Sequence, residues 1–367
     1  MSAPAAASGP EVCSSRVLAF DFIRCVACFA VIVLHAKHSF IDESVLSPAW
    51  NVATLCRSFA RPAVPLFVAI SGYFLLSRRF VGADVGRFYR RRFAKIGVPF
   101  AFWALFYFFA NAVEEGLQGA SFAAILDEHF LATLRNGHGY GYHLWYLYML
   151  VGLYAATPFV ATWFDAFSRR DAVVATSVLT LVVGAASAAT LRLDGRCGPP
   201  TIFIAFFYYL PYFLWGKILG DFAIAAARPL LTASALGVFL VSTLVAFGTQ
   251  ARWGDPNYFY ANSAGGASTP LVFCQALSFY VFALSWRTNP ALKFARTTTF
   301  LASLSFGVYL VHLCCYDAAR FLLAAVDLAP DAERPFVTFA AYVVATYVFA
   351  GIATFVFQRL PYLRRVV

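Results

Sequence analysis

The stretch RCVACFAVIVLH, residues 24–35, has the apolar character of the middle of a membrane-spanning helix, but it begins with Arg24 and ends with His35. In an α-helix the eleven steps between these two residues rise about 16 Å and make about three turns, so both side chains lie on nearly the same face. Ionisable side chains inside a bilayer are costly and usually face a cavity or a partner within the protein. We therefore expect this helix to border a functional cavity.

The composition indicates a membrane protein. Of the 367 residues, 61% are hydrophobic and 13% are charged, and the mean hydropathy is +0.71, which is too apolar for a soluble domain of this length. The net charge of +10 would suggest nucleic acid in a soluble chain. In a membrane chain the positions of the basic residues set the topology, so we predict a lipid bilayer and no nucleic acid as partner.

Apolar runs of about 20 residues predict an all-α polytopic integral membrane protein with about ten transmembrane helices. The predicted helices are residues 17–37, 53–77, 94–113, 143–164, 172–191, 201–219, 229–248, 269–286, 299–319 and 335–357. Lys and Arg concentrate in the segments that share a side with the N-terminus, so the positive-inside rule predicts that both termini are cytoplasmic. The predicted division is a cytoplasmic N-terminal tail, a transmembrane domain and a basic cytoplasmic C-terminal tail, at residues 1–16, 17–360 and 361–367.

Charged side chains recur on the first two predicted helices. Asp21 precedes Arg24 by three residues, so the two can pair on one helical face and lower the cost of burying the guanidinium. Snorkelling of both residues to the inner interface is an alternative. On the second helix Arg57 and Arg61 share a face, and two nearby prolines prevent regular backbone hydrogen bonding. A broken helix with two cations is expected beside a polar cavity.

Deeper in the second helix, Ser71, Gly72 and Tyr73 supply a hydroxyl, a small surface and a phenol. Ser71 and Tyr73 are candidates for the cavity wall. Tight helix packing through Ser71 and Gly72 is the other explanation of the same pattern.

The segment RRFVGADVGRFYRRRFAKIGVP, residues 78–99, is the densest cationic stretch of the chain. Arg90, Arg91, Arg92 and Lys95 are candidates to bind the phosphates of a ligand, because Arg clusters pair with phosphate oxygens. Topological anchoring alone would also explain the cluster. Neither a GxxxxGK[ST] loop nor a GxGxxG fingerprint occurs, so ATP hydrolysis and Rossmann-type cofactor binding are not indicated.

Three histidines are predicted at similar depth in the outer half of the bundle. His35 ends the first helix, His143 with Trp145 opens the fourth, and His312 with Tyr309 lies on the ninth. If the helices form one bundle, the three imidazoles could converge, although an interfacial histidine wetted by headgroup water would explain His35 alone. Three histidines can bind zinc, but these have no spacing of a known site, so we predict no metal.

Taken together, these segments resemble the membrane-bound acyltransferase 3 family, in particular its short members, such as the O-acetyltransferases of surface polysaccharides. The resemblance rests on an Arg-x10-His motif at Arg24 and His35, on RPAVPLFVAISGYFLL, FYRRRFAKIGVPF, YHLWYLY and SFGVYLVHL, and it covers residues 17 to about 360. It implies transfer of an acyl group, usually acetyl, from cytoplasmic acetyl-CoA to a hydroxyl of a carbohydrate or glycolipid beyond the membrane. The implied location is the inner (cell) membrane.

The resemblance also implies roles for individual residues. His35 would be the general base on the acceptor hydroxyl or a transient acyl carrier. Arg24, positioned by Asp21, would bind the donor or stabilise negative charge at its carbonyl. The basic cluster would contact the CoA phosphates, and the remaining candidates would line the cavity. The cluster consists of Arg90, Arg91, Arg92 and Lys95, and the cavity candidates are Arg57, Arg61, Ser71, Tyr73, His143, Trp145, Tyr309 and His312.

Two alternatives stay open at the level of the sequence. Larger relatives carry an added extracytoplasmic hydrolase-like domain, for which this chain has no room, so we expect direct transfer, a partner protein or a homo-oligomer. An exporter or flippase of a glycan or lipid-linked glycan would also suit the broken second helix and the intramembrane cations.

Overall fold

The computed structural model describes residues 10–36, 46–119, 121, 123, 141–194, 204–253, 269–286, 292–328 and 334–367. This part of the chain is helical and contains no strand. The elements are α1 (Pro10–Ala36), α2 (Pro48–Ala60), α3 (Ala63–Leu75), α4 (Asp84–Arg92), η2 (Phe93–Gly97), α5 (Val98–Leu117), η4 (Tyr142–Leu144), α8 (Trp145–Ala166), α9 (Arg169–Asp194), α10 (Ala205–Ala225), α11 (Pro229–Trp253), α12 (Pro270–Ser285), α13 (Leu292–Ala325), α14 (Pro335–Arg359) and η7 (Leu363–Arg365).

The predicted fold class is confirmed, because each of the ten predicted segments contains a helix. Within the described residues, eight helical segments are long and apolar enough to cross a membrane by length and composition. Of the other two predicted spans, α12 has only 16 residues, and α10 packs between α3, α8, α9 and α12. Large apolar side chains remain exposed on α9, α11 and α14, as expected where helices face lipid.

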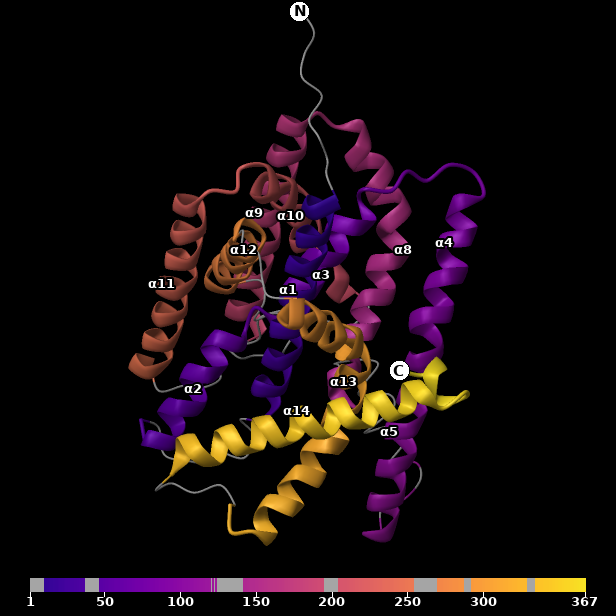
Figure 1. Ribbon diagram of the computed structural model, residues 1–367, viewed down its shortest axis with the longest axis vertical. Helices are drawn as coiled ribbons and strands as arrows, with labels where there is room; N and C mark the ends of the chain where they lie inside the picture. Colours follow the sequence, from indigo (N-terminus) through magenta and orange to yellow (C-terminus); the bar gives the residue numbers. More distant parts are fainter. Residues whose placement is uncertain are drawn as a thin grey trace, which may run out of the picture.

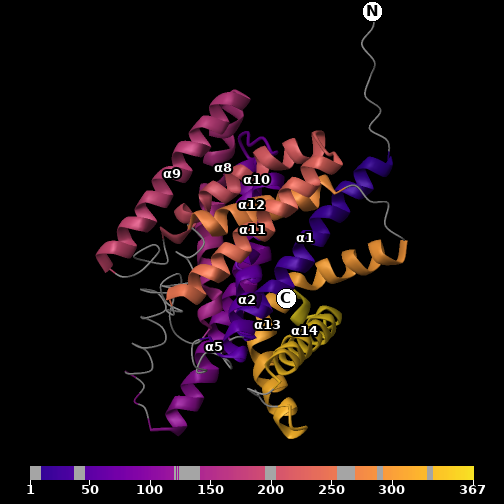
Figure 2. The ribbon, with the colours of Figure 1, turned by 90° about the vertical axis from the view of Figure 1, so that its left-hand side faces the viewer.

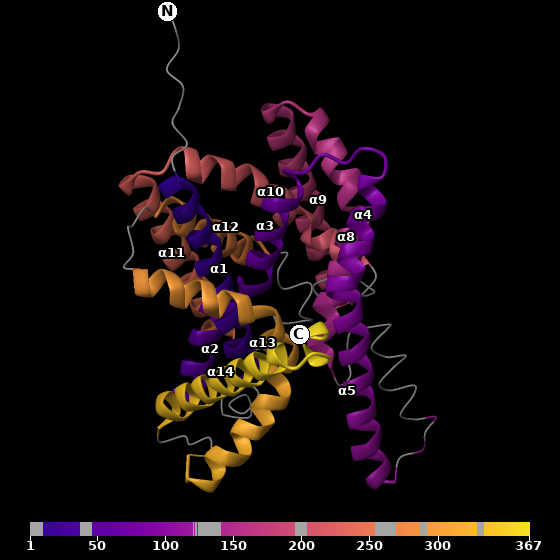
Figure 3. The same ribbon diagram turned by 45° about the vertical axis from the view of Figure 1, so that its right-hand side comes forward.

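Helix α1 lies near the centre of the molecule, with α11 and the α4–α5 rod on opposite sides (Figure 1). It contacts α2, α3, α12, α13 and α14. Figure 2 shows α9 along one edge of the molecule and α13 with α14 at the other, and Figure 3 shows α4, η2 and α5 following one another in one long rod. The central position of α1 explains how one helix can present side chains to several neighbours.

The second predicted helix is broken where its prolines begin. Helix α2 ends at Ala60 and α3 begins at Ala63, with Arg61 and Pro62 in the turn between them. Proline has no N–H to donate to the preceding turn, and its ring clashes with the carbonyl four residues back. The interruption of this helix is therefore confirmed.

Glycines allow α3 and α10 to touch through their backbones. A Cβ atom added at Gly72 would lie 1.8 Å from the carbonyl oxygen of Phe213, and one added at Gly216 would lie 2.1 Å from that of Ala69. Neither position has room for a side chain, which supports helix packing as the reason for Gly72. The neighbouring Ser71 does line the cavity described below.

The CxxC pair of α1 faces α13. The Cys25 thiol donates to the carbonyl oxygen of Thr298 at 3.3 Å, and the Cys28 thiol donates to that of Ser305 at 3.6 Å. Both cysteines are free thiols. They therefore connect α1 to the helix that carries His312.

Candidate active site

A cavity of about 750 Å³ lies inside the helical bundle, between α1, the broken α2–α3 pair, α8 and α13. Ten of the fifteen predicted site residues lie on its wall, and five do not. Those on the wall are Arg24, His35, Arg57, Arg61, Ser71, Arg92, Lys95, His143, Trp145 and Tyr309. Those absent from the wall are Asp21, Tyr73, Arg90, Arg91 and His312.

Asp21 contributes through Arg24. Its carboxylate accepts from the Arg24 guanidinium at 2.9 Å, and the Asp21 side chain is only 7% exposed. The predicted ion pair is therefore present, and the buried carboxylate offsets part of the cost of placing a cation in the bundle. The guanidinium also lies 5.9 Å from the centre of the Phe74 ring. Both contacts fix the direction in which Arg24 faces the cavity.

His35 has a hydrogen-bond partner that sequence reasoning missed. Its Nδ1 atom lies 2.8 Å from the hydroxyl oxygen of Tyr142, and Tyr142 also lines the cavity. Tyr142 begins the short η4 turn directly after Gly141, whose φ of +74° lies in the left-handed region that favours glycine. A Cβ atom at Gly141 would also lie 3.1 Å from Cβ of Tyr107. Gly141 thus permits the turn that brings Tyr142 to His35.

The three predicted histidines converge. The His312 ring centre lies 4.9 Å from that of His35 and 5.1 Å from that of His143. His312 is fully buried behind the cavity wall, and its Nδ1 contacts the carbonyl oxygen of Tyr309 at 2.6 Å. Because a carbonyl only accepts, Nδ1 of His312 carries the proton.

The histidine cluster has aromatic walls. The His143 ring packs edge-on against Tyr107 at 4.9 Å, and the Tyr309 hydroxyl donates to the His143 carbonyl oxygen. Within the described residues, no group of three His, Cys, Asp or Glu side chains is arranged to hold a metal ion. The imidazoles of the cluster contact tyrosine rings and one another.

Side chains of the basic cluster before α5 line two different pockets, one internal and one at the surface. Arg92 and Lys95 line the internal cavity, and both also line a surface pocket of about 510 Å³ that includes Arg91. Arg90 lines neither space. The Arg92 guanidinium lies 4.9 Å from the ring centre of Tyr154, a favourable cation–π distance. Arg92 therefore stands where the surface pocket and the cavity meet.

Tyr73, predicted for the cavity wall, packs elsewhere. Its ring lies 4.6 Å from that of Phe20, and the ammonium nitrogen of Lys217 lies 5.4 Å from its centre. Ser71, two residues earlier, lies on the wall and donates to the carbonyl oxygen of Phe67 at 2.9 Å. The two residues occupy different sides of α3, as a separation of two positions in a helix requires.

The last residues of the chain also reach the site. Sequence reasoning places residues 361–367 in a basic tail, but Val366 is buried and its carbonyl oxygen accepts from the Trp103 indole at 2.7 Å. Val367 and Gln358 lie on the cavity wall. No pattern in the sequence indicates these contacts, because they depend on where α14 leads the chain.

The fold and the site define a polytopic membrane protein with an internal cavity lined by guanidinium groups and imidazoles. Residues 17–355 match the acyltransferase domain that defines the acyltransferase 3 family, and the chain belongs to this family. It is therefore a membrane acyltransferase. No curated protein and no solved structure matches the chain.

Proposed function

We propose that the protein transfers an acetyl group from cytoplasmic acetyl-CoA to a hydroxyl of a cell-envelope carbohydrate on the far side of the inner membrane. The observation that carries the proposal is the single cavity that contains both Arg24 and His35 on its wall and has Arg92 at its junction with a basic surface pocket. About 16 Å of α1 separates Arg24 from His35. A volume of about 750 Å³ lies within the usual range for small-molecule sites.

The basic surface pocket suits the phosphates of the donor. Guanidinium groups pair with phosphate oxygens in a bidentate manner, and the pocket contains Arg87, Arg91 and Arg92. Because Arg92 and Lys95 also line the cavity, a donor with its phosphates in the pocket could extend its pantetheine arm inward. The thioester would then enter the cavity while the nucleotide part stays at the surface.

The orientation follows from the distribution of basic residues. Segment 78–95 carries seven Lys and Arg residues, the largest single group that the positive-inside rule assigns to the cytoplasm. The donor pocket would then face the cytoplasm, where acetyl-CoA is available. His35 lies at the other end of α1, towards the acceptor side.

At His35 the proposed reaction is a direct acyl transfer. Nε2 of His35 takes the proton from the acceptor hydroxyl while the oxygen attacks the thioester carbonyl. The C–S bond then breaks, the acetyl ester forms, and the imidazolium returns its proton to the CoA thiolate. Arg24, paired with Asp21, binds the donor or stabilises the negative charge that develops at the carbonyl.

Tyr142 is a positioning residue in this scheme. With Nδ1–H of His35 donated to the Tyr142 oxygen across 2.8 Å, Nε2 is left unprotonated and able to accept. The contact also favours the imidazolium that forms during the reaction, because the charge strengthens the hydrogen bond. Tyr142 therefore acts on the reaction through His35.

The test is mass spectrometry of envelope glycans and lipids from a deletion strain that is complemented with wild-type protein or with His35→Ala at matched expression. We expect an acetyl increment that is lost in the deletion, restored by the wild type and not restored by His35→Ala. Full acetylation with both His35→Ala and Arg24→Ala would refute the mechanism. An unchanged acetyl pattern together with an accumulated intracellular glycan would instead indicate an exporter.

A further inference from the structure

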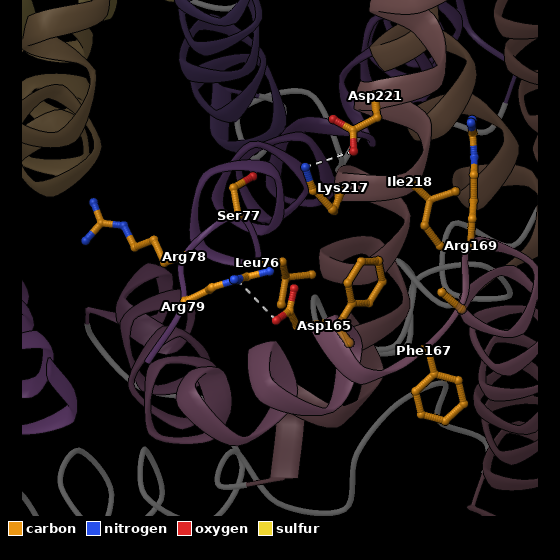
Figure 4. Close-up of a pocket in the computed structure, with 12 residues that line it drawn as sticks. Leu76, Ser77, Arg78, Arg79, Asp165, Phe167, Arg169, Lys217, Ile218 and Asp221 are labelled. Carbon is orange, nitrogen blue, oxygen red and sulfur yellow. Dashed lines mark ion pairs between the residues drawn. The ribbon is translucent and has the colours of Figure 1, made fainter. Parts of the chain in front are cut away.

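A second basic surface pocket, of about 440 Å³, lies between the end of α3, the α8–α9 turn and α10 (Figure 4). It shares no residue with the cavity that contains His35, but Arg78 and Arg79 also line the basic surface pocket that is proposed for the donor phosphates. Its charged side chains are Arg78, Arg79, Arg169, Lys217, Asp165 and Asp221. The proposed acyl transfer assigns no role to Arg169 or Lys217, which line this pocket and neither of the other two spaces.

The cations of the pocket exceed its carboxylates by two. Asp165 pairs with Arg79 at 3.4 Å, and Asp221 pairs with Lys217 at 2.8 Å; Figure 4 shows both pairs. Arg78 and Arg169 make no ion pair within the described residues. Two positive charges are thus left uncompensated, which favours an anionic ligand.

The two ion pairs differ in how firmly they hold their cations. Arg79 and Asp165 are 79% and 56% exposed, and an exposed pair contributes little to stability, so Arg79 can turn to a ligand at small cost. Lys217 is mostly buried, and its ammonium group also lies 5.4 Å from the centre of the Tyr73 ring. Lys217 is therefore a fixed anchor, with Arg79 and Arg169 as adjustable partners.

The position of the pocket in the helical bundle indicates the kind of anion. One candidate membrane span ends at Ala166 and the next begins at Arg169, so the pocket lies at the end of two spans. Leading away from it, Phe159 of α8 and Leu181 of α9 expose about three quarters of their surface. A phosphate at the pocket would therefore lie at the ends of two helices that both expose apolar side chains.

We propose that this pocket binds the phosphate of an anionic membrane phospholipid, with the acyl chains lying along the exposed faces of α8 and α9. Guanidinium groups match phosphate geometry, and basic pockets between membrane helices are typical headgroup sites. A soluble phosphate ester would use the same cations but would have no use for the apolar faces. The proposal concerns lipid binding and does not depend on the acyl acceptor.

The test compares lipid retention by the full-length protein in nanodiscs that contain equal amounts of phosphatidylglycerol and phosphatidylcholine. The protein is then released from the nanodiscs, and native mass spectrometry counts the lipids that stay bound to it. We expect phosphatidylglycerol to be enriched with the wild type. Each basic residue near an anionic headgroup contributes about fivefold in affinity. Arg169 lines this pocket and not the donor pocket, so Arg169→Gln should lose about fivefold.

The matched control is Arg170→Gln. Arg170 is an exposed neighbour of Arg169 on α9 and lies outside the pocket. We expect this control to retain phosphatidylglycerol as the wild type does. All three proteins should show the same melting temperature in phosphatidylcholine alone, because the replaced side chains are exposed.

Three results would overturn the proposal. One is equal retention of the two lipids by the wild type. A second is the same loss in Arg170→Gln as in Arg169→Gln, which would indicate diffuse surface charge. The third comes from calorimetry in phosphatidylcholine nanodiscs with inorganic phosphate and with CoA as probes. Tighter binding of either probe to wild type than to Arg169→Gln would assign the pocket to a soluble phosphate.

Discussion

Replacing Tyr142 by Phe isolates one hydrogen bond at the candidate active site. The substitution removes a single hydroxyl, 2.8 Å from Nδ1 of His35, and keeps the ring whose centre lies 5.3 Å from that of the imidazole. A hydrogen bond to a charged group contributes about 1.5–3 kcal/mol, against about 0.5–1.5 kcal/mol for a neutral pair. Because His35 becomes charged only when it takes the proton, the loss is the difference of about 1–1.5 kcal/mol, and we expect kcat/KM to fall about five- to tenfold.

The assay measures release of the CoA thiol by purified protein in proteoliposomes, with acetyl-CoA and the envelope glycan identified in the deletion strain. Tyr148→Phe is the matched control, because the Tyr148 ring packs on Phe100 at 4.6 Å and lies off the cavity wall. The reasoning fails if Tyr142→Phe keeps kcat/KM within twofold of wild type while His35→Ala is inactive. In that case the phenol would only fill space beside the imidazole.

Two further predictions concern the donor pocket and the packing of the helices. Arg92→Gln should raise KM for acetyl-CoA at least tenfold with little change in kcat, because a charge-assisted hydrogen bond to phosphate contributes about 1.5–3 kcal/mol; steady-state kinetics would measure this. Gly72→Ala should destabilise the protein by about 1–3 kcal/mol and lower its melting temperature, because the added Cβ would lie 1.8 Å from the Phe213 carbonyl oxygen.

Each of these variants has a matched control. Arg90→Gln should leave KM within about twofold, since Arg90 lines neither the cavity nor the donor pocket. In Gly237→Ala the added Cβ meets no atom within 4 Å, so the melting temperature should hold or rise slightly. Equal KM values for the two arginine variants would place the CoA phosphates elsewhere. Equal melting temperatures for the two glycine variants would contradict the close contact of α3 with α10.

Short-range features of this protein follow from the sequence. A bilayer requires every spanning segment to satisfy its own backbone hydrogen bonds, so the apolar runs predict the helices of the bundle. The interruption before Ala63 follows from Pro62, and the Asp21–Arg24 ion pair follows from a spacing of three residues. The motifs on these helices also predict the acyltransferase 3 family, to which the chain belongs.

Contacts between distant segments were decided by the tertiary structure. His35, Tyr142 and His312 meet although they come from α1, η4 and α13. Only the packed helices distinguish Arg92, which reaches the cavity, from Arg90, which does not. Hydrophobic periodicity defines which side of a helix is apolar, but it does not define the rotation and depth of that helix against its neighbours. Those two quantities place the imidazoles and guanidinium groups around one cavity, and they arise only when the whole bundle packs.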